Sequence, residues 1–182
     1  GNRGGFLLDA VTGGASHRFS GSAIGSSEQG GRQIVIRQAS LGGIEVTRKV
    51  FVPRTGYFVR YLELLRNPSA DSVTLNLRVT SHFRFLRKVQ GGFSFDREPR
   101  LIGTSSGDTL LDVSDPATAD RWVLVDDDDD GDPFLINTLP AVAHVFDGEG
   151  GPRAAGEAEF FTDFTSLFGR LSQEWREVTV PP

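Results

Sequence analysis

The residues best suited to chemistry are a run of aspartates in the middle of the chain. Asp126 to Asp130 are consecutive, and Gly131 and Asp132 follow them. Adjacent carboxylates repel one another, which costs stability unless a cation or solvent disperses the charge. The spacing matches the first half of a calcium loop, D-x-D-x-D-G, in which alternate residues place oxygen atoms around one hard cation. The carboxylates expected to bind the ion are Asp126, Asp128, Asp130 and Asp132.

The second half of the calcium motif is absent. Asn137 occupies the twelfth position, where a bidentate carboxylate closes the loop, and Pro133 follows the last aspartate. Two interpretations therefore stand side by side. The run is either a weak Ca²⁺ site, with a dissociation constant on the order of 0.1–1 mM as in extracellular modules, or a solvated acidic loop between two strands.

The sequence contains no recognised catalytic motif. The chain has no cysteine, so disulfides, zinc–thiolate sites and thiol nucleophiles are excluded. Its three histidines, His17, His82 and His144, have no metal-ligand spacing, and no G-x-S-x-G motif is present. Ser105, Ser106, Gly107 and Asp108 have ordinary turn composition. We therefore expect no enzyme activity, no catalytic residue and no cofactor other than calcium.

Aromatic side chains offer a second kind of binding site. Trp122 and Trp175, with Tyr57 and Tyr61, could present flat faces on which sugar rings stack. The alternative is that these rings belong to the core. Trp122 and Trp175 are the ligand-binding candidates that follow from the first interpretation.

Composition narrows the class of protein and its partners. The chain has 182 residues, a net charge of −5 and 22 glycines. That length predicts a single domain over residues 1–182, loop-rich over residues 1–31. The acidic balance argues against nucleic acid, and no apolar run reaches the roughly 20 residues of a membrane span, so no membrane insertion is expected. The first residue is not Met, which suggests a processed chain or a piece excised from a longer one.

Hydrophobic alternation predicts an all-β fold. Ile44, Val46, Val50 and Val52 share one parity, and Arg48 interrupts their row, which predicts a bend or bulge there. The near-continuous apolar run over residues 57–65 predicts a central strand covered on both faces. The cleanest alternation covers residues 73–80. Strands at roughly ten-residue spacing, ended by Gly and Pro turns, predict an antiparallel β-sandwich.

One stretch has helical spacing instead. Its apolar residues are Phe160, Phe161, Phe164, Leu167, Phe168 and Leu171. This pattern predicts one short amphipathic helix near residues 157–171, lying over an edge or end of the sandwich.

The order of several segments resembles a known family. These segments include Glu45 to Pro53, Thr104 to Asp108, Ala119 to Trp122 and Asp130 to Pro133. Between residues 42 and 146 they resemble an uncharacterised β-sandwich module of large, multidomain secreted or surface proteins of bacteria. The resemblance implies a secreted, extracellular or cell-surface location and no enzyme activity. In that family a further strand follows the V-P-P element, so we expect the C-terminal strand to be incomplete here. The missing strand would leave an edge open to strand addition or homo-oligomeric contacts.

Three functions follow from these observations. The first is a structural or adhesive module, stiffened by calcium and bound to protein or glycan at a cell surface. The second is a carbohydrate-binding module. The third is a glycan-active enzyme domain whose carboxylates lie unrecognised among 24 acidic residues.

Overall fold

The computed structural model describes most of the chain. The described residues are 6–22, 24–84, 86–90, 93–97, 99–115, 118–126, 141–147, 156–163 and 168–182. They form strands β1 to β14 and one turn of 3₁₀ helix, Gln29–Gly31. The protein is therefore nearly all-β, and its paired strands run antiparallel, as expected of a β-sandwich. None of the described residues belongs to a helix long and apolar enough to cross a membrane.

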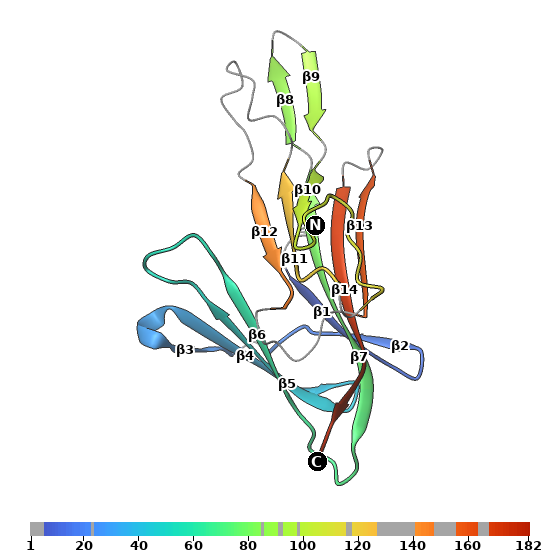
Figure 1. Ribbon diagram of the computed structural model, residues 1–182. Helices are drawn as coiled ribbons and strands as arrows, with labels where there is room; N and C mark the ends of the chain where they lie inside the picture. The colour runs from blue at the N-terminus through green and yellow to red at the C-terminus, as the bar shows by residue number, and fades with distance from the viewer. Residues whose placement is uncertain are drawn as a thin grey trace. The chain divides into compact units, whose positions relative to one another are not determined.

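The described strands form four sheets (Figure 1). The first has the order β13-β14-β7-β1-β2, with bounds Glu157–Asp163, Phe168–Val180, Val73–Arg84, Leu7–Thr12 and Ala15–Arg18. The second has the order β3-β4-β5-β6, with bounds Ser26–Glu28, Gln33–Leu41, Ile44–Phe51 and Arg60–Arg66. The third has the order β10-β11-β12, with bounds Arg100–Thr104, Trp122–Asp126 and Val142–Val145. The fourth is the hairpin of β8 and β9, Leu86–Gln90 and Phe93–Arg97.

Contacts divide the chain into two compact units. One comprises Gly1–Leu7 and Arg78–Arg176, and the other comprises Leu8–Leu77 and Glu177–Pro182. In the first unit, Val123 and Val125 of β11 pack with Leu171 of β14 in a core that excludes water. The partly buried side chains around this core are Phe83, Leu101, Leu111, Phe146 and Phe160. Each fully buried Val or Leu contributes roughly 2 kcal/mol to folding.

The second unit has its own core. The fully buried side chains come from β1, β4 and β5, and they include Leu8, Leu41, Ile44 and Val46. The turn between β4 and β5 approaches β1 and β2 so closely that a Cβ on Gly42 would lie 3.3 Å from His17 and from Thr12. Gly42 has a φ of 60°, which glycine adopts without the strain that a side chain would cause. This two-glycine turn is typical of a tight hairpin.

The prediction of a helix near residues 157–171 is wrong. Residues 157–163 and 168–171 belong to β13 and β14, which form an antiparallel hairpin. Phe160 is opposite Leu171 on the core side, whereas Phe161 is opposite Arg170 and is 43% exposed. Pairing of the two strands brings together apolar residues from separate stretches of the chain. The spacing of these residues in the sequence happens to fit the period of a helix. Phe164 and Leu167 lie outside the described residues.

Two further details of the strands differ from expectation. The register of β5 with β6 is continuous through Arg48, and the irregularity in this sheet lies in β4 between Gln38 and Leu41. The apolar run over residues 57–65 is not a covered central strand. Its first residues form a loop, and the rest belongs to β6, which ends the sheet and exposes Leu62 and Leu64.

Candidate functional site

The structure describes only one of the four aspartates expected to bind calcium. Asp126 is the last residue of β11, opposite Arg100 of β10, and it is buried. Asp128, Asp130 and Asp132 lie outside the described residues. Within the described ranges, no three His, Asp or Glu side chains are grouped so that they could hold a metal ion. The calcium site therefore remains a prediction.

Among the described residues, Asp120 accepts several hydrogen bonds through its carboxylate, and it was not among the residues predicted from the sequence. It precedes β11 and is 1% exposed. Its Oδ1 accepts hydrogen bonds from the Ser106 amide at 3.1 Å and from the Ser105 hydroxyl at 3.2 Å. Its Oδ2 accepts one from the Asp112 amide at 2.9 Å. One carboxylate thus ties together two separate parts of the loop between β10 and β11.

Further hydrogen bonds stabilise the described part of this loop. The Asp120 amide donates to the Asp112 carbonyl at 2.8 Å, and the Arg121 amide donates to the Ser105 hydroxyl at 2.8 Å. Thr104, which is 1% exposed, donates from its hydroxyl to Asp108 at 3.0 Å. We call Thr104, Ser105, Ser106, Asp112 and Asp120 the Asp120 knot. Hydrogen bonds within this set satisfy the two buried members, Thr104 and Asp120.

The electrostatics of the Asp120 knot favour a charged carboxylate. Burial raises the pKa of Asp120, but hydrogen bonds from the amides of Asp112 and Ser106 and from nearby hydroxyls lower the pKa more. The balance leaves the pKa below its usual value, so the carboxylate is ionised at neutral pH. Asp112 behaves similarly, because the Ser114 amide donates to it and lowers the pKa of its carboxyl.

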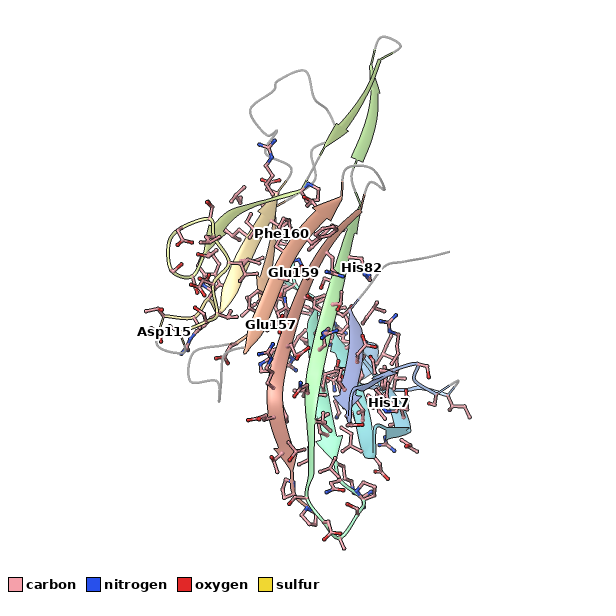
Figure 2. All side chains as sticks on the ribbon, turned by 90° about the vertical axis from the view of Figure 1, so that its right-hand side faces the viewer. His17, His82, Asp115, Glu157, Glu159 and Phe160 are labelled. Atoms are coloured by element: carbon pink, nitrogen blue, oxygen red, sulfur yellow. The ribbon has the colours of Figure 1, made fainter. Side chains whose placement is uncertain are left out.

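A second set of charges links strands in the five-stranded sheet. Glu174 of β14 has an 8% exposed side chain, and its Oε2 accepts from Arg78 Nε of β7 at 2.8 Å. Arg176 Nε lies 3.5 Å from Glu174 Oε1, and the Arg176 guanidinium also pairs with Glu157 of β13. Glu157 and Glu159 lie along β13, with Phe160 next to them (Figure 2). These alternating charges connect three neighbouring strands.

The second unit contains a comparable pair in a more buried position. Arg48 of β5 has a side chain only 10% exposed, and its Nη2 lies 2.6 Å from Oε1 of Glu63 on β6. The Arg48 guanidinium also lies over two aromatic rings, 4.9 Å from the Phe19 centroid and 5.7 Å from the Tyr61 centroid. The residue that interrupts the apolar row of the sequence is thus enclosed by an anion and two π faces.

His144 is the most buried of the three histidines. It lies on β12 and is 8% exposed. Its ring makes an edge contact with Phe83 at 5.2 Å and lies 6.0 Å from the ring of Phe6. Burial lowers the pKa of His144, so the ring is neutral at neutral pH. His17 on β2 is exposed, and His82 lies on β7 (Figure 2).

The structure places the two tryptophans on separate strands. Trp122 begins β11, opposite Val145 of β12, and Trp175 lies in β14; both are half-buried. Among the aromatic residues whose burial is described, the most exposed rings instead belong to Tyr57 and Phe58, in the loop between β5 and β6. Phe58 is 57% exposed, and its centroid is 6.4 Å from that of Phe51.

Arginines accompany these exposed rings. The guanidinium groups of Arg32 and Arg60 lie 5.7 Å and 5.3 Å from the centroid of Phe51. The sequence has no Asp or Glu between Glu45 and Glu63, and Glu28 of β3 pairs with Lys49 near this end of the sheet. Comparisons of the chain with protein-family models, curated proteins and solved structures find no match.

Proposed function

We propose that this protein is a non-catalytic structural or adhesive module of a secreted or surface-exposed bacterial protein. The observation that carries the proposal is the Asp120 knot. Both oxygens of its buried carboxylate accept amide hydrogen bonds from the chain itself. A carboxylate used in this way holds a loop in one shape, whereas a catalytic carboxylate must reach a substrate. The ion pairs Arg48–Glu63 and Arg78–Glu174 likewise join strands.

The adhesive function is tested with beads coated with the whole chain. We expect them to be retained on bacterial envelopes or on an extracellular-matrix or glycan surface. The matched control is a bead coated with heat-unfolded protein. Retention equal to that of the control on every surface contradicts an adhesive function, and turnover of a glycan substrate contradicts a non-catalytic one.

We propose further that Asp126, Asp128, Asp130 and Asp132 bind Ca²⁺ weakly. The spacing of these carboxylates supports the proposal. A ligand that binds only the folded state raises the melting temperature. The protein should therefore melt several degrees higher in millimolar Ca²⁺ than in EDTA, and the variant D128N/D130N should lose this difference. Identical melting curves for the wild type contradict the calcium site.

A carbohydrate-binding module is the second candidate. The exposure of Tyr57 and Phe58 favours it, because flat aromatic faces stack on sugar rings. Trp122 and Trp175 are the other aromatic candidates. A glycan array should then give signals that Tyr57→Ala abolishes if the loop binds, or that Trp122→Ala or Trp175→Ala abolishes if the tryptophans do. An array without signal excludes this candidate for the glycans it carries.

A further inference from the structure

Two strands of this chain end their sheets and show complementary outward rows. β6 is the last strand of the order β3-β4-β5-β6, and β13 is the first of the order β13-β14-β7-β1-β2. An edge strand presents backbone N–H and C=O groups that another strand can bind. Strand addition is then decided by the side chains at alternate positions along the two edges.

The outward row of β6 is apolar in the middle and basic at both ends. Leu62 and Leu64 are 42% and 44% exposed, and the neighbouring positions of the same row are Arg60 and Arg66, both exposed. The residues opposite the two leucines on β5 are Lys49 and Thr47. No other described strand pairs with β6 beyond β5, so the leucines lie at an edge of the sheet, without an apolar neighbour opposite them on β5.

The outward row of β13 is acidic and then aromatic. Glu157 and Glu159 have side chains that are 55% and 52% exposed, and Phe161 is 43% exposed. Their ion pairs with Arg176 and Arg170 are exposed. Pairs of this kind contribute about 0–1 kcal/mol and can share their charges with a new partner.

We propose that β6 of one copy of this protein pairs antiparallel with β13 of a second copy. In the register that places Arg66 opposite Glu157 of the second copy, Leu62 is opposite its Phe161 and Leu64 is opposite its Glu159. Directly opposed residues of an antiparallel pair lie on the same face. An aliphatic–aromatic pair and an opposite-charge pair each stabilise such a ladder by roughly 0.2–1 kcal/mol.

The charges also decide against pairing of like edges. Two β6 strands would bring Arg60 and Arg66 of each copy together, and two β13 strands would bring glutamates together. Like charges opposite one another destabilise a ladder, so only the unlike pairing is favoured. The pair of copies then keeps one free β6 and one free β13, and the contact can propagate from copy to copy. The inference rests on the proposed structural function, and it states how copies of the protein would assemble.

The test uses charge-reversed rows of the whole chain. The β6 variant is R60E/R66E, and the β13 variant is E157R/E159R. The control variant R37E/R54E makes the same change in charge as the β6 variant but leaves both edges intact. Circular dichroism checks that each variant is folded, and sedimentation velocity from micromolar to millimolar protein measures association. A single pair of strands is a small interface, so weak association is expected.

Wild type and the control variant should associate with rising concentration, and each edge variant alone should stay monomeric. An equimolar mixture of the two edge variants should associate again, because every wild-type edge then meets its complement. A monomeric wild type overturns the inference. A β13 variant that associates as well as wild type points to pairing of like β6 edges and overturns it too. Loss of bead retention with assembly intact would count only against the adhesive function.

Discussion

Arg48 and Glu63 are directly opposite each other in the register of β5 and β6, and Arg48 Nε donates to Glu63 Oε1 at 2.7 Å. The two side chains are 10% and 18% exposed, so both charges have lost most of their hydration. A buried pair of this kind adds little net stability compared with apolar side chains of similar size, whereas removal of one partner leaves the other charge uncompensated.

Glu63→Ala should therefore lower the free energy of unfolding by about 3 kcal/mol. The double variant R48M/E63L should recover most of that loss, because neither charge remains buried. Urea denaturation measures both effects. The control is Arg66→Ala, which removes a pair with Glu45 whose arginine is 75% exposed and should cost less than about 1 kcal/mol. Equal losses for Glu63→Ala and Arg66→Ala would contradict the role of burial.

Asp120 provides a second prediction. Asp120→Asn removes the charge and replaces one acceptor oxygen with a donor, which leaves an amide of Ser106 or Asp112 without its acceptor. The expected cost is about 1–3 kcal/mol. Asp71→Asn is the control, because Asp71 lies in an exposed loop where its backbone carbonyl accepts hydrogen bonds from Asn67 and Ser69. Equal melting temperatures for both variants would contradict a stabilising role of the Asp120 knot.

The same carboxylate predicts a response to acid. The pKa of Asp120 is lower in the folded protein than in the unfolded chain, where it is about 3.9. Its contribution to stability is complete above the unfolded pKa and is lost as the pH falls toward the folded value. Below about pH 4 the difference in stability between wild type and Asp120→Asn should therefore shrink. A difference that stays constant from pH 7 to pH 3 argues that the charge of Asp120 is unimportant.

The sequence predicted the local part of this fold well. Alternation over residues 44–51 and 73–80 identifies β5 and β7, and the glycines after Leu41 mark the turn before β5. These features depend on neighbouring residues only. The prediction of a helix was wrong because Phe160 and Leu171 come together through strand pairing. Their spacing of eleven residues fits three helical turns as well as a hairpin.

The missed site residues depend on distant contacts. Asp120 binds Ser106, fourteen positions earlier, and nothing in the turn composition of residues 104–108 points to that partner. Arg48 offered a clearer signal. A charge within an apolar row, followed by Glu63 at the matching place of the next strand, would have indicated a buried pair. The apolar run of residues 57–65 predicted a covered strand, but whether a strand is central or lies at an edge depends on the sheet order.

His144 provides the last prediction. Its ring lies between Phe6 and Phe83, and among the described residues its buried Nε2 has no hydrogen-bond partner. Burial places the folded pKa below that of the unfolded chain, which is about 6.5. The unfolded state therefore binds a proton first as the pH falls, and the free energy of unfolding should decrease below about pH 6.5, by at most about 1.4 kcal/mol per pH unit.

His144→Phe should flatten this slope between pH 6.5 and pH 5, because a phenyl ring fits the aromatic surroundings and does not titrate. Urea denaturation at several pH values measures the slope. His17→Phe is the matched control, since it removes a histidine that is exposed on β2. If His17→Phe flattens the curve as much as His144→Phe, the burial of His144 is not the cause of the acid sensitivity.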